Sequence, residues 1–430
     1  DTAVAHAELS KYFQSGMTAS VEVVDTRTAQ RNLTTDSRPN ANTSQVNLRL
    51  NIPLLKYSGE VSASGYLNSA RKQQEAAIED YKFFLTTLVR DTVAAYWDYR
   101  LATESAQIRE KSRDRVMRIT DQVDLFTSSP NPAKEKLLKE QLAQVIYTAT
   151  GARANRSQAL IAAQQQAEQA RTNLAMMLGV PPEQFTTLSQ AGDEIPKAII
   201  PKEFDVKKYQ ASWRKTAMEN RLDLRAANLR QDAVKIMVNK AERDLYPQVD
   251  LNLSAGYQGL SEGNKIDNMW NALNDNVPGP NWSAGLEFRY PIGNQAAEGT
   301  LDSSRARLQQ AGLAVYQTIR GIHAGVDIDA GYVERYVKAI SKAEQAVAEY
   351  TEALAAWKRK PLTDPSSILG MLQTESQLTE SYINMLAIRA AYAQTVADIR
   401  QKTGLLGSTG NTIEDYSISY SDVTMLPGIN

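Results

Sequence analysis

Cysteine is absent from this chain of 430 residues, and the only histidines are His6 and His323. Without thiols there is no disulfide framework, no thiolate metal site and no cysteine nucleophile. Two histidines so far apart in the sequence argue against a His-rich metal site or a His-dependent triad. The formal net charge of −1 argues against a nucleic-acid-binding protein, which would show a basic excess. We therefore expect no metal, no cofactor and no nucleic-acid partner.

Long apolar runs are also missing. No stretch of 18 apolar residues occurs, so no transmembrane helix is predicted. Residues 1–20 lack a basic region followed by an apolar region, so no signal peptide is visible. Because the sequence starts at Asp1 without an initiator methionine, the protein is either cytoplasmic or a mature or trimmed chain, and the helical residues expected before Asp1 (below) favour the second.

Proline is scarce over long stretches, with none between Pro53 and Pro130 and none between Pro291 and Pro361. Because proline breaks helix interiors, these gaps permit very long helices. The gaps are rich in good helix formers, and apolar residues recur every three or four positions. A helix over residues 61–126 would be roughly 100 Å long. Taken alone, the helices favour a soluble coiled-coil scaffold.

Four short segments follow a two-residue period instead. Residues 17–25, 45–54, 248–257 and 282–292 alternate between apolar and polar side chains, which indicates β-strands. Each segment has about ten residues, the length of a tilted strand that crosses a bilayer. The segments therefore predict membrane strands beside the helices.

The polar faces of these strands carry five charged residues: Glu22, Arg49, Asp250, Glu287 and Arg289. In a soluble sheet this is a solvent face. In a membrane barrel it faces a wet lumen, and the apolar face contacts lipid. Aromatic residues near the strands are either interfacial girdles or packing residues: Tyr57, Tyr246, Tyr257, Trp282 and Tyr290. We take the five charged residues as lumen-lining candidates.

The chain is predicted to be an internal duplication. The pattern Gly-x-Leu-x-Ser-x-Arg begins at Gly65 and again at Gly299, 234 positions later, and each copy follows a strand pair and opens a long helix. The first repeat covers residues 1–202, with strands at 16–28 and 44–55, helices at 59–127 and 133–178, and an equatorial segment at 179–202. The second covers residues 203–403, with a helix at 205–244, strands at 247–259 and 282–293, and helices at 296–358 and 366–403. A polar tail covers residues 404–430.

The two repeats begin differently. Before its first strand, the second has about 40 residues, at 204–244, that are mostly helical in pattern. The first has only residues 1–15 before its own strand. We expect roughly 25 to 30 further helical residues to precede Asp1 in the intact protein.

Four strands per chain cannot close a barrel. In lipid, open strand edges leave backbone groups unpaired, so only a closed barrel is stable. The smallest membrane barrels have about eight strands and are filled by side chains. A water channel therefore requires at least three chains, which would supply twelve strands.

Several segments, in order along the chain, resemble the TolC family of outer-membrane factors. Residues 220–225, Asn-Arg-Leu-Asp-Leu-Arg, are similar to the family's Asn-Arg-Pro-Asp-Leu-Arg, with leucine in place of proline. Residues 241–247 resemble the run that leads into the third strand. Residues 174–179 and 371–378 resemble the end of the first helical hairpin and the helix after the second tip.

The resemblance implies an α+β membrane protein: a homotrimer with a 12-stranded β-barrel in outer-membrane lipid and an α-helical periplasmic tunnel of antiparallel coiled-coil hairpins. The equatorial region would hold residues 180–210 and the tail after Gly404. Such a protein is a passive exit duct in a Gram-negative envelope, exporting small toxic compounds. A periplasmic adaptor and an inner-membrane pump would be its partners.

The resemblance also implies two periplasmic tips that contact the adaptor. Neither tip has the family's Gly-Leu-Thr-like motif. Gly370 and Gln373 occupy the positions of a frequent acidic ring at the entrance, so Asp364 is the remaining gate candidate. Its other interpretation is a helix cap or a solvated side chain. The tip candidates are Ser128, Ser129, Pro130, Asn131, Lys360, Pro361, Leu362 and Thr363.

One motif resembles a catalytic element. Gly259 to Gly263 match G-x-S-x-G around Ser261, but a nucleophile elbow needs a helix directly after it. An Asn-rich stretch follows instead, so we predict a loop and no enzyme activity.

Two alternatives to drug export stay open. One is an outer-membrane channel for type I protein secretion, which the unusual tips favour. The other is a soluble coiled-coil scaffold.

Overall fold

The computed structural model describes residues 2–28, 41–128, 130–189, 192–197, 206–263, 272, 279–359, 365–406 and 423–428. The chain divides into two compact units. Unit 1 comprises Asp1–Glu79 and Arg225–Gln317, and unit 2 comprises Asp80–Leu224 and Thr318–Asn430. Each unit therefore combines a segment from the first half of the chain with one from the second half.

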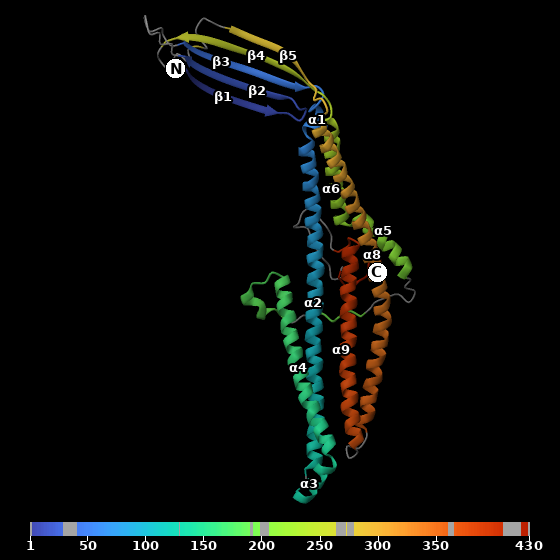
Figure 1. Cartoon of the computed structure of the whole chain (residues 1–430). Helices are drawn as coiled ribbons and strands as arrows, with labels where there is room; N and C mark the ends of the chain where they lie inside the picture. Colours follow the sequence, from blue (N-terminus) through green and yellow to red (C-terminus); the bar gives the residue numbers. More distant parts are fainter. Residues whose placement is uncertain are drawn as a thin grey trace. The chain divides into compact units, whose positions relative to one another are not determined.

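Unit 1 contains an antiparallel sheet with the strand order β1-β2-β3-β4-β5 (Figure 1). The pairing of β3 with β4 joins the two halves of the chain, and it places Arg49 opposite Ser254. The strands are β1 (Thr2–Tyr12), β2 (Thr18–Thr28), β3 (Ala41–Pro53), β4 (Gln248–Glu262) and β5 (Gly279–Arg289).

Strands β2 to β5 lie at the four segments with a two-residue period. The expectation of four strands per chain is wrong, however, because β1 adds a fifth. Its sequence alternates too, with Ala5 and Ala7 on one face and His6 and Glu8 on the other. The open backbone edge of β2 gives this segment a strand to pair with.

Short helical segments of unit 1 adjoin the sheet. They are α1 (Gly59–Ala63), the start of α2 (Gly65–Thr127), most of α6 (Leu222–Arg243) and the start of α8 (Gln295–Lys358). Val238, Ala241 and Leu301 form a small buried cluster between α6 and α8. Gly65 permits close packing, because a Cβ there would lie 3.1 Å from the side chain of Lys240.

Unit 2 is a helical bundle in which α2, α4, α8 and α9 lie side by side (Figure 1). One buried cluster joins Trp97 of α2 to Val347 of α8 and Met385 of α9. A second joins Val116 of α2 to Val145 of α4. The elements not yet given are α3 (Pro132–Gln141), α4 (Ala143–Met177), η1 (Pro182–Thr187), α5 (Val206–Asn220) and α9 (Pro365–Lys402).

Three helices expected to be continuous are interrupted. Ser64 separates α1 from α2, Leu142 separates α3 from α4, and Arg221 separates α5 from α6. At Leu142 the backbone leaves helical geometry, yet its N–H still donates to Leu138 and its carbonyl still accepts from Ile146. This break is therefore a local kink in a continuing hydrogen-bond ladder.

None of the helices in the described part of the chain is long and apolar enough to cross a membrane.

Candidate functional site

The strand register places all five charged candidates on one face of the sheet. Glu22 is in the row of Asn47, and Arg49 is in the row of Ser20 and Ser254. Asp250 lies opposite Glu287, and Gln248 lies opposite Arg289. Because directly paired residues and every second residue share a face, we name this the charged face of the sheet.

Glu22 is the most connected residue of the charged face. Arg49 on β3 approaches it at 2.6 Å, and His6 on β1 approaches it at 3.0 Å. Asn47 donates a hydrogen bond at 3.3 Å to Oε2 of Glu22, the same oxygen that Arg49 binds. The carboxylate therefore joins three neighbouring strands, and its charge is balanced by a guanidinium.

The other three candidates form a second group on β4 and β5. Arg289 binds Glu287 at 2.6 Å, and Gln248 donates to Asp250 at 2.6 Å. Glu287 and Arg289 are exposed, whereas Asp250 is 5% exposed. The charged face thus presents paired, hydrated charges at β5 and partly enclosed ones nearer the middle of the sheet.

The opposite face is apolar on β2 from Ala19 to Val23 and along the paired parts of β3, β4 and β5, while Asp25 and Arg27 lie farther along β2 on the same face. Within β2, Val21 is 44% exposed and Glu22 is 9% exposed; on the edge strand β5, which is exposed on both faces, Trp282, Leu286 and Phe288 are 83%, 68% and 66% exposed. We name this the apolar face; besides those three residues it carries Ala19, Val21, Val23, Val46, Leu48, Leu50, Ile52, Val249, Leu251, Leu253, Ala255 and Ala284. Burial is therefore inverted relative to a water-soluble sheet.

The first predicted tip is a short turn after α2. Ser128 closes the helix, with its N–H and its hydroxyl both donating to the carbonyl of Asp124. Asn131 caps α3 by accepting from the N–H groups of Ala133 and Lys134, and Pro130 lies in the bend between them. Of the remaining candidates, Ser129, Lys360, Pro361, Leu362, Thr363 and Asp364 lie outside the described residues.

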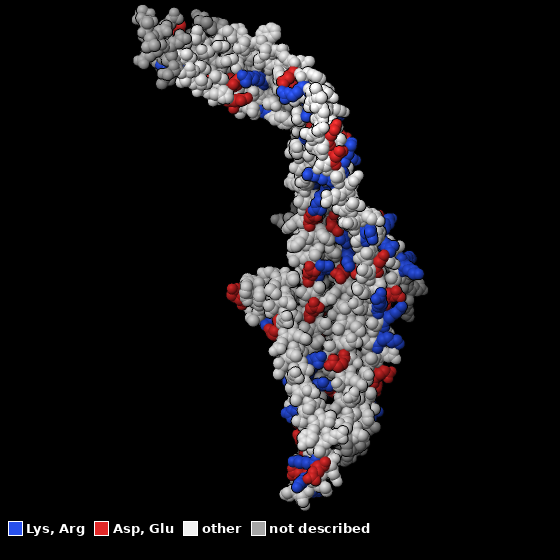
Figure 2. Space-filling view, viewed as in Figure 1, with Lys and Arg blue, Asp and Glu red and all other residues white. Residues whose placement is uncertain are grey.

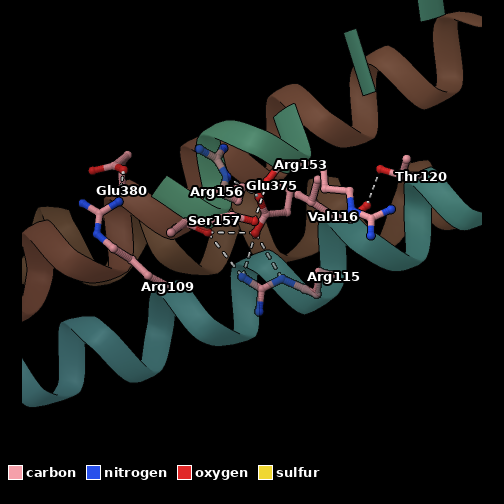
Figure 3. Close-up of polar contacts among 10 residues, drawn as sticks. Arg109, Arg115, Val116, Thr120, Arg153, Arg156, Ser157, Glu375 and Glu380 are labelled. Atoms are coloured by element: carbon pink, nitrogen blue, oxygen red, sulfur yellow. Dashed lines mark hydrogen bonds and ion pairs between the residues drawn. The ribbon is translucent and has the colours of Figure 1, made fainter. Parts of the chain in front are cut away.

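A buried ion cluster in unit 2 escaped the sequence analysis. Figure 3 shows Arg115 of α2 and Arg156 of α4 converging on Glu375 of α9. The distances are 2.8 and 3.4 Å, and Thr379 donates to the same carboxylate at 2.9 Å. Glu375 is fully buried, so this network fixes three helices to one another.

The sequence held one signal for this cluster. Glu375 occupies a position of the apolar stripe on α9, between the buried residues Met371 and Leu378. A charged residue at such a position needs a partner when it is buried. The pattern cannot say which arginine of another helix supplies it.

The pKa values of three further aspartates in unit 2 differ from the ordinary carboxyl value. The hydrogen bond from Arg214 holds the pKa of Asp327 below its usual range. Burial raises the pKa of Asp329, although Lys402 lies 2.6 Å away and acts against the shift. Burial also raises the pKa of Asp398.

The catalytic and metal alternatives gain no support from the geometry. Ser261 lies within the end of β4, paired with Asn42 of β3, and it is buried. The Asn-rich stretch that follows lies almost entirely outside the described residues. Within the described ranges, no group of three acidic or histidine residues is placed to hold a metal ion.

Comparisons with known proteins give a family match over part of the chain and a shared fold over nearly all of it. Residues 213–405 match the family model described as outer membrane efflux protein. None of the curated proteins matches the chain in sequence.

Solved structures share the fold over nearly the whole chain. The outer-membrane channel OprN is 18% identical, with a TM-score of 0.66, covering 93% of this chain and 81% of that one. The Campylobacter jejuni outer-membrane channel CmeC is 14% identical, with a TM-score of 0.64, covering 94% and 77%. The open state of the Neisseria gonorrhoeae outer-membrane channel MtrE is 15% identical, with a TM-score of 0.64, covering 94% and 81%. Residues 213–405 thus match the outer membrane efflux protein family, and the chain as a whole has the fold of these outer-membrane channels.

Proposed function

We propose that the protein is the outer-membrane exit duct of a tripartite efflux system and exports small toxic compounds. The observation that supports this best is the inverted burial of the sheet. Its exposed side chains include Trp282, Leu286 and Phe288, while Glu22 and Asp250 are enclosed. An apolar face of this kind is stable in lipid, and a charged face opposite it is stable against a water-filled lumen.

The duct is a homotrimer with a 12-stranded barrel. Strands β2 to β5 of one chain form an open sheet, and lipid does not tolerate the two open edges. Three copies would supply twelve strands and a lumen wide enough for water. In each copy the two strand pairs come from the two halves of an internally duplicated chain.

Transport through this duct is passive, and the protein is not an enzyme. A periplasmic adaptor would bind the tips, at Ser128 to Asn131 and at residues 360–363, and an inner-membrane pump would supply the energy. Asp364 is the gate candidate at the second tip. The exposed hydroxyl of Ser128 and the capping side chain of Asn131 make the first tip polar, which suits a reversible contact with a partner.

The charged face sets the field inside the duct. Glu22, Arg49, Asp250, Glu287 and Arg289 line the lumen, so changing their charge should change which ions pass. The test is ion selectivity in planar lipid bilayers. Arg49→Glu and Arg289→Glu should shift selectivity toward cations.

The matched control is Arg27→Glu, which makes the same charge change on the opposite face of β2. It should leave selectivity unchanged. A shift in the control alone would reverse the assignment of the two faces. Purified protein that gives no conductance and stays in the aqueous fraction would support the coiled-coil scaffold instead.

A further inference from the structure

The edge strand β1 is the part of the sheet that the exit-duct proposal does not use. It pairs with β2 over its whole length, from Thr2 opposite Thr28 to Tyr12 opposite Thr18. All eleven of its residues are exposed. The opposite edge strand, β5, is also exposed along its whole length. The two edges are the surfaces through which copies of the sheet must join.

Strand direction decides which edges fit together. Each neighbouring pair in the sheet is antiparallel, so β1 and β5 run the same way and β2 runs opposite to β5. Copies related by rotation about a channel axis keep these directions. Joining β5 to the β1 of the next copy would make a parallel junction, whereas joining β5 to β2 makes an antiparallel one.

A wall that keeps β1 would also break the pattern of transmembrane barrels. Five strands in each of three copies give an odd total, but bacterial barrels have even numbers of antiparallel strands. Antiparallel pairs are, in addition, slightly more stable per residue than parallel ones. A wall built from strands β2 to β5 of each copy has an even number of strands, and every junction between copies is antiparallel.

The side chains of β1 are also poorly suited to a lipid-facing wall. Lys11 shares the row of Ala19, so its charge lies on the face that β2 keeps apolar from Ala19 to Val23. A charged residue on the lipid face of a strand is destabilising. Most other residues of β1 on this face are alanines, which bury little apolar area.

The turn between β1 and β2 is anchored to residues outside the sheet, whereas β1 beyond the turn is held through its pairing with β2. Gly16 has a φ of +91°, and a Cβ there would lie 2.2 Å from the carbonyl oxygen of Tyr57. Gly59 donates to the carbonyl of Ser15 at 3.0 Å. Beyond the turn, His6 makes a side-chain contact to β2, at Glu22. The ion pair between Glu22 and Arg49 does not involve β1, so it remains if β1 leaves the sheet.

The second half of the chain shows the other conformation that such a segment can take. There, α6 (Leu222–Arg243) precedes β4 at the place where β1 precedes β2. Residues 2–12 contain three alanines, a glutamate, a leucine and a lysine, which are good helix formers. If β1 leaves the sheet, its residues can therefore form a helix instead.

We propose that β1 is a displaceable cover of the β2 edge, and that β5 of a second copy of this chain replaces it when the trimer forms. The inference rests on the proposed trimeric duct. Before assembly, β1 protects a strand edge that would otherwise pair with any exposed strand. After assembly, the wall consists of β2 to β5 from each copy.

The test locks β1 in place. Because the chain has no cysteine, Ala7→Cys with Val23→Cys creates a single disulfide across the β1–β2 register. The oxidised protein should stay monomeric in native mass measurements, with its trimer fraction reduced at least about tenfold, and reduction should restore the trimer. The matched control, Leu48→Cys with Ala255→Cys, bridges β3 and β4 and should form trimers in both states.

A second pair of variants reports which edges meet. Val21→Cys with Ala284→Cys places thiols on β2 and β5, and oxidation of the assembled protein should link different chains. Links between Ala7→Cys and Ala284→Cys would instead mean that β1 stays in the wall, and would overturn the proposal.

The outcomes separate this proposal from the exit duct itself. A locked β1 that forms conducting trimers as well as the control leaves the duct standing and overturns the role of β1. The absence of trimers and conductance in every form, including a chain lacking residues 2–12, overturns both.

Discussion

The sheet of unit 1 and the helices of unit 2 follow opposite burial rules. In unit 2 the enclosed side chains are mostly apolar, such as Val326 and Ile399. In the sheet the enclosed ones include Glu22 and Asp250, and the exposed ones include Trp282 and Leu286. On the face seen in Figure 2, charged groups are spread along the helices of unit 2.

The difference fits the surroundings that the proposed duct gives to each part. A helix with a buried apolar stripe and charged outer positions is adapted to water. In the proposed duct, a sheet with aromatic and aliphatic residues on one face and Glu22, Arg49, Asp250, Glu287 and Arg289 on the other would contact lipid outside and water inside. One chain of the proposed duct therefore has surfaces suited to two solvents, lipid and water.

The largest predicted effect concerns a fully buried carboxylate inside the helical unit. Glu375→Ala should destabilise unit 2 by about 3–5 kcal/mol, because Arg115 and Arg156 then lose their shared carboxylate in a buried site. The loss should appear as a lower midpoint in thermal unfolding followed by helical circular dichroism.

The control for this prediction is Glu380→Ala on the same helix. Glu380 binds Arg109 at 3.2 Å but its side chain is 58% exposed, so the change should cost at most about 1 kcal/mol. Equal losses for the two variants would contradict the importance of burial at Glu375.

The next effect tests the apolar face. Leu253→Arg should destabilise the sheet in lipid by about 2–4 kcal/mol if the residue lies near the bilayer midplane. Asn252→Arg, at the adjacent position on the charged face, should have a much smaller effect. Urea titration of the protein folded into lipid vesicles measures both, and a reversed order would exchange the two faces.

A smaller effect is expected from trimming a buried aliphatic residue of unit 2. Ile399 is fully buried, whereas Ile328 is 53% exposed. Ile399→Val should cost about 0.5–1.5 kcal/mol, because it removes a packed methylene group, and Ile328→Val should cost less than about 0.5 kcal/mol. Chemical denaturation compares the two, and a larger loss at Ile328 would mean that assembly buries that position.

The smallest effect concerns the pair of Asp327 and Arg214. The pKa of Asp327 is lowered in the folded state, so its contribution to stability is present above the ordinary carboxyl pKa and is lost as the pH falls through the lowered value. The pair is partly exposed, so Asp327→Asn should cost less than about 1 kcal/mol at pH 7. The difference from the unmodified protein should vanish at strongly acidic pH; a difference that persists there would point to lost packing.

Sequence patterns predicted the periodic parts of the fold well. The two-residue alternation indicated β2 to β5, and it placed the five charged candidates on a single face, whereas Asp25 and Arg27 of β2 lie on the other. Long proline-free stretches indicated α2 and α8. Both signals are local, because strand and helix periodicity depends on which side of one element is buried.

Features that depend on distant partners were not predictable in this way. Strand β1 mixes helix formers such as Ala3 and Glu8 with strand formers such as Val4 and Tyr12, so its composition did not indicate the pairing with β2. The binding of Glu375 by Arg115 and Arg156 requires three helices to meet, and a single sequence does not say which residues face one another. The kink at Leu142 contains no proline or glycine, so the sequence did not indicate it.

The most direct test of the two-solvent account is modification of single cysteines in an open channel. A charged, membrane-impermeant thiol reagent is added to planar bilayers that contain either Asn252→Cys or Leu253→Cys protein. The account predicts that the reagent reduces the current through the Asn252→Cys channel and leaves the Leu253→Cys channel unchanged. A current loss only at position 253 would contradict it.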